Sequence, residues 1–303
     1  MKVVVAGATG FVAGTLVPRL LAGGHEVIAL GHDEARLWRF SGAQPLVVDL
    51  RRPDLGDALP DGVDAIIHLA QANVPFPAGA ADLFAVNVGS VQQLLEYARR
   101  RGVRRFVYGS TGSVYGGGDR PWKESDPPLG AGYYAATRQA AERLVVAYGD
   151  LLPYVVLRTI TPYGPGQRNR LVPGLIGRVR SGQAVTLREG GRPRMNPVFD
   201  AHVAEVFAQA LDVPGNQVVN LGGDEVLSVR EMAEVIGREL GTAPRFEDAP
   251  GASGGDVVAD VTRLRQVFRL PDRLTPFAAG VRAMLDAEAS PGGADAGDGT
   301  GAG

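Results

Sequence analysis

The sequence predicts an α/β protein built on a doubly wound parallel sheet, with a smaller α/β domain made mainly from its C-terminal half. Short apolar runs rich in valine, such as Lys2 to Ala6, suit strands that are buried on both faces. These runs alternate with segments of helical periodicity, the first of which starts at Phe11, at the spacing of parallel strands and crossover helices. A glycine-rich turn joins the first strand to the first helix.

This turn, Gly7 to Gly10, predicts a dinucleotide site of the Rossmann type. Gly7 allows a tight turn, Gly10 lets a pyrophosphate approach the backbone closely, and Ala13 is small enough for the helix to pack on the sheet. The spacing Gly-x-x-Gly-x-x-Ala differs from the common Gly-x-Gly-x-x-Gly pattern. Free N–H groups at the helix start favour phosphate binding. The expected cofactor contacts here are Gly7, Thr9, Gly10, Phe11 and Val12.

The second strand, Val27 to Leu30, runs into Gly31, where many dinucleotide enzymes place an acid that binds the adenosine ribose. Without a carboxylate at Gly31 a 2′-phosphate would not be repelled, and Arg36 or Arg39 could reach it. Both arginines also fit as solvated helix residues. We therefore expect NAD or NADP, with a slight preference for NADP, and cofactor contacts from His32 and Arg36.

The following strands supply further expected contacts. The third strand, Pro45 to Leu50, ends with Asp49, which either accepts a hydrogen bond from the adenine amino group or caps the next turn. The fourth strand runs from Asp64 to Ala70, and its end should face the cofactor because ligands bind at the carboxyl ends of such strands. A long helix from Asp82 to Arg101 and a fifth strand from Arg105 to Ser110 come next. The further cofactor contacts expected in this region are Leu50, Leu69, Ala70, Gln71, Asn87 and Ser110.

The composition narrows the kind of protein. Lys and Arg total 31 against 33 Asp and Glu, a net charge of -2, which argues against a partner such as nucleic acid or a membrane surface. There are no cysteines, and the four histidines do not stand at ligand spacing, so no metal site is expected. No apolar stretch approaches the ~20 residues of a membrane-spanning helix. A strand begins at Lys2 in place of a signal peptide, so we expect a cytoplasmic protein.

Chemistry-bearing residues gather after the fifth strand. Tyr134 and Arg138 open the next predicted helix, Tyr134 to Tyr148, and lie one above the other because they are four residues apart. A cation beside a phenol favours the phenolate, and the hydroxyl of Thr111 could orient a carbonyl or an alcohol. Together they suit proton transfer during hydride chemistry at a carbon that bears oxygen. A Tyr-x-x-x-Arg pattern alone is more often an ordinary helix face.

Eight blocks of sequence together resemble the extended short-chain dehydrogenase/reductases, the superfamily of nucleotide-sugar epimerases and dehydratases. The resemblance runs from Val3 to about Leu285. In chain order the blocks are VAGATGFVAG, IIHLAQA, NVGSVQQLLEYAR, FVYGSTGSVYG, YYAATRQAAE, YGPGQ, NLGGDEVLSVREMAEVIGREL and DVVADVTRLRQVF.

The resemblance implies a catalytic Ser or Thr, a Tyr and a Lys. Thr111 matches the first, Tyr134 the second, and Arg138 stands where the family has Lys. That lysine binds the nicotinamide ribose and favours the phenolate. Arginine keeps the charge, but its planar fork need not fit the ribose hydroxyls. A working variant site, a slowed site and a lost activity all remain open.

Two further departures bear on the substrate. The family usually has Asn, a substrate and cofactor contact, where Thr161 stands. Dehydratases usually follow the catalytic Thr with Asp-Glu, whereas this chain has Gly112 and Ser113, which argues against 4,6-dehydration. The segment from Gly164 to Arg194 closes over the nucleotide diphosphate in the family, and guanidinium groups suit phosphate. The expected substrate contacts are Gln71, Ser113, Thr161, Arg168, Arg170 and Arg194; solvated surface arginines are the alternative.

The resemblance also implies the domain organisation. We expect a dinucleotide domain over 1–165, to which 195–222 return, and a substrate domain from 166–194 and 223–288. Residues 289–303 are rich in Gly and Ala and predict a disordered tail. A homodimer is expected, with the 82–101 and 134–148 helices of two copies forming a four-helix bundle.

The function expected from all this is an NAD(P)-dependent epimerase or oxidoreductase that acts on a nucleotide-linked sugar through a keto intermediate. The first alternative is an NADPH-dependent reductase of a non-sugar ketone, since the same fold and triad serve both. The second alternative is a non-catalytic, cofactor-binding regulator that has lost the catalytic lysine.

Overall fold

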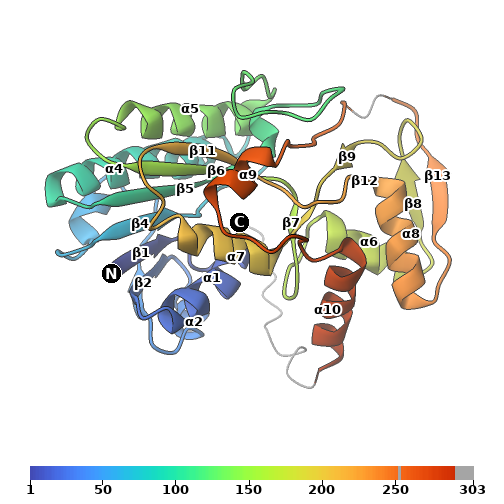
Figure 1. Ribbon diagram of the computed structural model, residues 1–303, viewed down its shortest axis with the longest axis horizontal. Helices are drawn as coiled ribbons and strands as arrows, with labels where there is room; N and C mark the ends of the chain where they lie inside the picture. Colours follow the sequence, from blue (N-terminus) through green and yellow to red (C-terminus); the bar gives the residue numbers. More distant parts are fainter. Residues whose placement is uncertain (252–253, 291–303) are drawn as a thin grey trace.

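The computed structural model describes residues 1–251 and 254–290 and contains a seven-stranded parallel sheet (Figure 1). The strand order is β11-β6-β5-β4-β1-β2-β3, so the chain winds outward from β1 in both directions. This is the doubly wound Rossmann fold that the alternation of strands and helices predicts. The strands of the sheet are β1 (Lys2–Ala6), β2 (Glu26–Gly31), β3 (Gln44–Val47), β4 (Ala65–His68), β5 (Arg105–Thr111), β6 (Tyr154–Thr159) and β11 (Gln217–Leu221).

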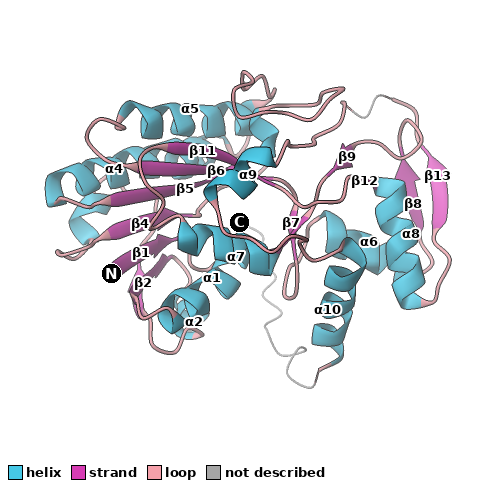
Figure 2. Cartoon of the chain, viewed as in Figure 1, coloured by secondary structure: helices cyan, strands magenta, loops and turns pink. Residues whose placement is uncertain are grey.

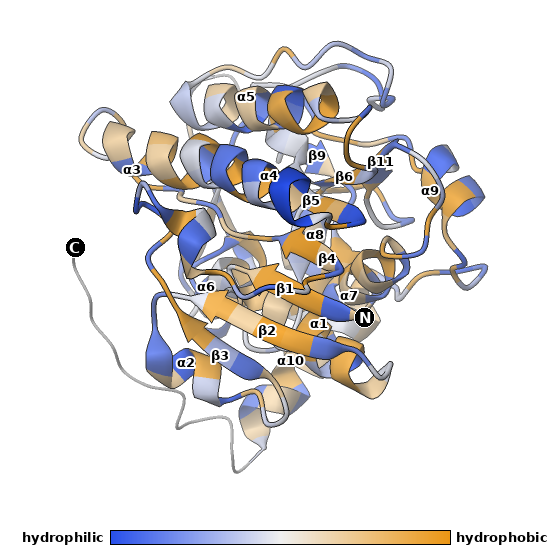
Figure 3. Ribbon diagram, turned by 90° about the vertical axis from the view of Figure 1, so that its left-hand side faces the viewer, coloured by the Kyte–Doolittle hydropathy of each residue, from blue (hydrophilic) through white to orange (hydrophobic). Residues whose placement is uncertain are grey.

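Helices cover both faces of this sheet. The helices α4 (Ser90–Arg101) and α5 (Tyr133–Ala147) pack on one face, and α1 (Phe11–Ala22) and α7 (Asp200–Gln209) pack side by side on the other (Figures 1 and 2). The strands are buried between two apolar cores, which is why their sequences are almost continuously hydrophobic (Figure 3).

Local signals in the sequence set several helix ends. Gly102, with φ of +68°, ends α4, as expected of a glycine in the left-handed region. The helix α8 (Val229–Leu240) begins with a complete capping box between Ser228 and Glu231, as the spacing predicts. Asp200 is the first residue of α7, after Phe199, and its carboxylate accepts a hydrogen bond from Thr15 Oγ1 at 2.7 Å.

The helix expected over 82–101 is broken into three pieces. The helix α3 (Ala80–Phe84) leads into a π-helical turn, Ala85–Gly89, before α4 begins. The turn carries Asn87, whose buried amide bonds both backbone groups of Ala72 at 2.8 and 3.1 Å. This long-range contact has no local signature, because a π-turn and an α-turn show nearly the same apolar spacing.

A third apolar core lies beyond the carboxyl end of the sheet, on the right of Figure 1. It is enclosed by α6 (Leu171–Arg180), α8, α10 (Phe277–Ala289) and the parallel pair β8 (Ala184–Leu187) and β13 (Arg245–Asp248). Short elements connect the parts: α2 (Glu34–Trp38), β7 (Pro162–Tyr163), β9 (Arg194–Met195), β10 (Val198–Phe199), β12 (Leu227–Ser228), α9 (Thr262–Val267) and 3-10 turns at Leu55–Ala58 and Gly112–Val114. Residues 291–303, most of the predicted tail, lie outside the described residues.

Within the described part of the chain, no helix is both long and apolar enough to cross a membrane.

Candidate functional site

The glycine turn between β1 and α1 has the shape that a dinucleotide requires. Gly7 has φ of +87°, and a Cβ on it would lie 2.6 Å from the backbone nitrogen of Ala70. Gly10 precedes α1 and offers no side chain to cap it, so the first N–H groups of the helix stay open to a ligand. A pyrophosphate fits this cradle because it is anionic and needs close backbone approach.

Gly31, at the end of β2, lies against the side chain of Thr9. A Cβ at Gly31 would lie 2.7 Å from Cγ2 of Thr9, so Thr9 occupies the space that a side chain would need. An open cavity of about 750 Å³ lies directly after this residue. Its lining is His32, Asp33, Glu34, Ala35 and Trp38.

The two arginines expected near a 2′-phosphate already have partners. Arg36 pairs with Asp33, its Nε 3.2 Å from Oδ2. Arg39 donates from Nη2 to the carbonyl oxygen of Gly10 at 3.2 Å and, at 3.4 Å, to that of Ala8. Burial lowers the pKa of Arg39, with a smaller contribution from the nearby Arg36 charge. Arg39 therefore braces the glycine turn from the side.

The expected adenine contact, Asp49, lies just after β3. Arg51 holds its carboxylate with bonds of 2.7 to 3.1 Å and lowers the pKa of Asp49 below its usual range. The next residue, Leu50, is buried. The Asp49 carboxylate is exposed, and Arg51 already holds it.

The phenol of Tyr134 lies at the carboxyl end of β4. Its hydroxyl donates to Oε1 of Gln71 at 2.6 Å. Gln139, on the same helix, donates to the carbonyl oxygen of Val114 at 2.9 Å and so ties α5 to the turn after Thr111. These bonds place Tyr134, Gln71 and the turn after Thr111 at the ends of β4 and β5.

Arg138 differs from the expectation that it contacts a ribose. Its side chain is fully buried, with Nη1 3.5 Å from the carbonyl oxygen of Ala70 and Nη2 bonded to that of Gly109. Its guanidinium lies 4.7 Å from the ring centroid of Tyr108. In this conformation Arg138 has no exposed surface for a ligand, and it clamps the ends of β4 and β5 from beneath. Its longer, forked side chain reaches two carbonyls at once.

Two other buried polar side chains surround Arg138. His68 lies against Ser90, with Nε2 2.8 Å from Oγ, and Ser90 itself donates to the carbonyl oxygen of Val86. His68 Nε2 therefore carries the proton. Burial, followed by the Arg138 charge, lowers the pKa of His68 to about 3. Burial also raises the pKa of Tyr108.

A buried ion pair fixes α5 to the sheet. Arg158 on β6 meets Glu142 on α5 at 2.7 Å, and both side chains are only 7% exposed. Ser110 donates its hydroxyl to the same carboxylate, so this hydroxyl faces the interior and not a cofactor. On its other side Arg158 donates to the Tyr115 hydroxyl at 2.7 Å, which donates in turn to Asn220. The sequence carries a signal for this pair, an arginine inside the apolar strand VVLRT, that the motif comparison passes over.

Thr111 ends β5 and caps the turn after it. Its Oγ1 accepts from the Ser113 backbone at 3.2 Å and donates to the Ser113 hydroxyl at 3.3 Å. Both hydroxyl groups are accessible, whereas Gly112 between them is buried. A Cβ on Gly112 would lie 2.2 Å from Cδ1 of Ile160, so a side chain there requires Ile160 to move.

The remaining expected contacts are spread over a wider area. Thr161 has φ of +41° and donates to Met195 Sδ at 3.2 Å. Asp256 holds Arg194 at 2.9 Å and also pairs with Arg192. Arg168 and Arg170 are exposed beside α6. Asn87 is fully buried, and its amide is taken up by Ala72 and by Thr137, so it supports the site from behind.

A model of the NAD dependent epimerase/dehydratase family matches residues 3–222. The chain belongs to this family. It is 31% identical to a dTDP-glucose 4,6-dehydratase of Streptomyces niveus over 77% of this chain and 72% of that protein. It is 29% identical to a 2-alkyl-3-oxoalkanoate reductase of Stenotrophomonas maltophilia over 82% of this chain and 78% of that protein. A mouse dTDP-D-glucose 4,6-dehydratase is 32% identical over 57% of this chain, which spans 51% of the mouse protein's length.

Solved structures agree with this assignment. MoeE5 in complex with UDP-glucuronic acid and NAD superimposes with a TM-score of 0.84 at 29% identity, covering 94% of this chain and 98% of MoeE5. The protein is thus an enzyme of the extended short-chain dehydrogenase/reductase type. The solved relative binds NAD, and the expected slight preference for NADP finds no support.

Proposed function

We propose that this enzyme is an NAD-dependent epimerase or oxidoreductase that acts at one sugar carbon of a nucleotide-linked sugar, through a keto intermediate. The observation that carries the proposal is the placement of Tyr134 and Thr111 at the ends of β4 and β5, next to an open glycine cradle. Ligands of such sheets bind at this edge.

The residues divide the chemistry between them. Bound NAD would supply hydride acceptance and return at the reacting carbon. With its phenol ionised, Tyr134 Oη takes the proton from the sugar hydroxyl, and as the phenol it returns that proton to the keto oxygen. The Thr111 hydroxyl, held by Ser113, hydrogen-bonds the same sugar oxygen. Arg138 keeps the backbone under Tyr134 in place and adds a buried positive charge beneath the site.

Dehydration is disfavoured on steric and chemical grounds. Gly112 carries no carboxylate next to Thr111, and a side chain there would require Ile160 to move. Ser113 supplies a hydroxyl where an elimination needs a stronger acid or base.

The adenosine end favours NAD over NADP. Asp33 and Glu34 line the cavity after β2, and their carboxylates would repel a 2′-phosphate. Arg36 is paired with Asp33, and Arg39 braces the glycine turn, so neither is free for the extra phosphate.

The substrate would lie between the sheet and the layer that holds the third apolar core. We assign this layer to the substrate domain predicted over 166–194 and 223–288. Arg168 and Arg170 are exposed for phosphate contacts, and Arg194 reaches the same side once it exchanges Asp256 for a phosphate. We also propose a homodimer through α4 and α5, for which light scattering should give twice the chain mass of 31.8 kDa.

The test is to incubate the enzyme and NAD with UDP-glucose, UDP-glucuronic acid or dTDP-glucose and to separate the products. Conversion of one sugar to its epimer or keto form supports the proposal. A 4-keto-6-deoxy product would show dehydration and contradict it. Nucleotide released on denaturation and weighed by mass spectrometry should be NAD or NADH, not NADP.

A ketone reductase is the second candidate, because the alkanoate reductase relative covers most of the chain and Thr161 replaces the usual substrate-binding Asn. Oxidation of NADPH or NADH by a 3-oxo acid, with no nucleotide-sugar turnover, would favour this candidate.

A further inference from the structure

Hydrogen bonds made by the residues before and after Gln71 hold its backbone close to Tyr134. The preceding residue, Ala70, donates its N–H to Ala6 at 3.1 Å and offers its carbonyl to Arg138. The following residue, Ala72, has its N–H and its carbonyl both bonded to the Asn87 amide. The backbone of Gln71 is therefore fixed, although its side chain is exposed.

The same loop makes a second contact with the start of α5. The ring of Phe76 stacks on Tyr133, with centroids 4.8 Å apart and planes within 17°. Gln71 meets Tyr134, the next residue, at 2.6 Å. The loop that carries Gln71 and Phe76 therefore contacts both Tyr133 and Tyr134. These two contacts fix the direction of the Tyr134 hydroxyl.

The hydrogen bond from Tyr134 to Gln71 competes with the hydrogen bond that a bound substrate would make to Tyr134. The Tyr134 hydroxyl has one proton to donate, and Gln71 Oε1 accepts it. The oxygen at the reacting sugar carbon, whether hydroxyl or carbonyl, accepts that same proton when it binds beside the phenol. The two oxygens compete, and the exposed amide can swing into solvent when the substrate oxygen arrives.

We propose that Gln71 is a positioning residue for Tyr134: its amide oxygen holds the phenolic hydroxyl in the substrate-free enzyme, and the reacting sugar oxygen takes over that hydrogen bond. The catalytic part of this statement rests on the proposed function. The contact itself does not.

The test uses the full-length protein with tyrosine labelled at the ζ-carbon, whose NMR signal reports the hydrogen bonding of each phenol. The chain has eight tyrosines, and Tyr134→Phe identifies the signal of Tyr134. Gln71→Met keeps the side-chain length but removes the acceptor, so the signal should move. Gln71→Glu keeps an acceptor and should leave the phenol hydrogen-bonded. Asn73→Met changes an exposed amide two residues away and should leave the signal in place.

A second readout measures the competition. Calorimetry gives the Kd of UDP-glucose for the NAD-loaded protein, and Gln71→Met should lower it by roughly 2- to 10-fold, the worth of one hydrogen bond. An unmoved Tyr134 signal in Gln71→Met, or a raised Kd, would overturn the proposal. If UDP-glucose does not bind, the proposed function is in doubt while the NMR comparison still decides the contact. If the signal moves but Tyr134→Phe turns over normally, the proposed function fails and the contact stands.

Discussion

The guanidinium of Arg138 lies 4.7 Å from the ring centroid of Tyr108, beneath α5 and out of contact with solvent. One turn earlier on the same helix, Tyr134 faces the accessible edge of the sheet. Arg138 therefore contacts the backbone near the strand ends, whereas the Tyr134 hydroxyl lies at the accessible edge of the sheet. This separation leads to the first prediction.

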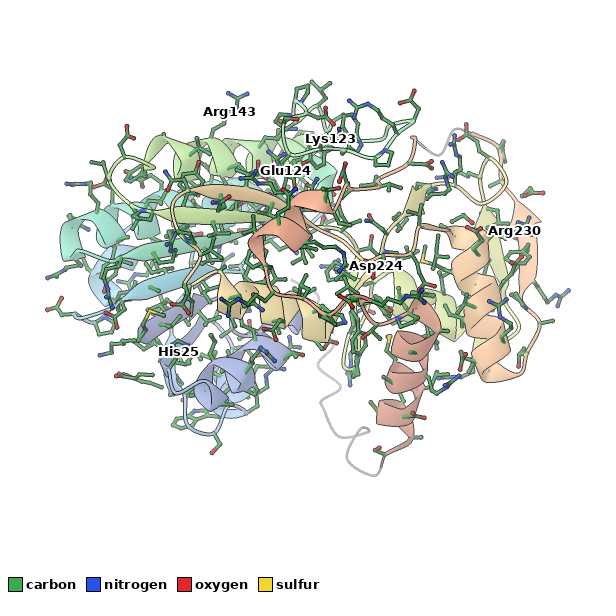
Figure 4. The ribbon with its side chains drawn as sticks, viewed as in Figure 1. His25, Lys123, Glu124, Arg143, Asp224 and Arg230 are labelled. Atoms are coloured by element: carbon green, nitrogen blue, oxygen red, sulfur yellow. The ribbon has the colours of Figure 1, made fainter. Side chains whose placement is uncertain are left out.

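Arg138→Lys should lower the free energy of unfolding by about 1–3 kcal/mol, because one ammonium group cannot serve both Ala70 and Gly109 and leaves a buried acceptor unpaired. Urea denaturation measures the change. Arg143→Lys is the matched control: Arg143 points away from α5 into solvent (Figure 4), and its replacement should change stability by no more than about 0.5 kcal/mol. Equal stability of the Arg138 variant and the wild type would show that the clamp contributes nothing.

Glu142→Gln should cost about 3–5 kcal/mol of stability, since it strands the buried charge of Arg158. The exposed pair of Glu26 with Lys2 gives the control, because Glu26→Gln should cost no more than about 1 kcal/mol. Denaturant midpoints of the two variants provide the comparison. Similar losses in both would contradict the assigned role of the Glu142 pair.

Thr161→Asn should raise the free energy of unfolding by about 0.5–1 kcal/mol. A β-branched residue at φ of +41° is strained, whereas Asn tolerates the left-handed region, and the gain exceeds the weak bond lost to Met195. Thermal unfolding of the two proteins tests this directly. A lower melting temperature in the variant would mean that the Met195 contact outweighs the strain.

His68 should make the protein less stable in mild acid. Its folded pKa of about 3 lies below the value of 6.5 for a free histidine, so the unfolded chain binds a proton that the folded chain does not. Stability is fully present above pH 6.5 and is lost as the pH falls toward 3. Between pH 7 and pH 5 the loss due to His68 is about 2 kcal/mol. In His68→Gln this part of the pH dependence should vanish, and parallel curves for both proteins would refute the assignment.

The parts of the fold that local sequence determines were predictable. The turn from Gly7 to Gly10 and the capping box of Ser228 and Glu231 follow from short-range geometry, and both appear where their spacing places them. The π-turn around Asn87 was not predictable, because it is stabilised by Ala72, fifteen residues away.

For the candidate site, motif matching named candidate residues but could not give the directions of their side chains. Tyr134 and Gln71 were both named from the sequence, yet nothing in it shows that they meet. Arg138 was expected at a ribose, and its turn inward depends on two carbonyls, that of Ala70 after β4 and that of Gly109 in β5. The Glu142 and Arg158 pair joins a helix to a strand, so its partners become clear only in three dimensions.

The most direct test of the central claim compares wild type with Tyr134→Phe for turnover of the nucleotide sugar and for binding of NAD. Because the variant lacks only the phenolic hydroxyl that transfers the proton, turnover should fall at least about 100-fold while the affinity for NAD stays within about twofold. Full turnover in Tyr134→Phe would contradict the account, since the proton would then have to come from another group.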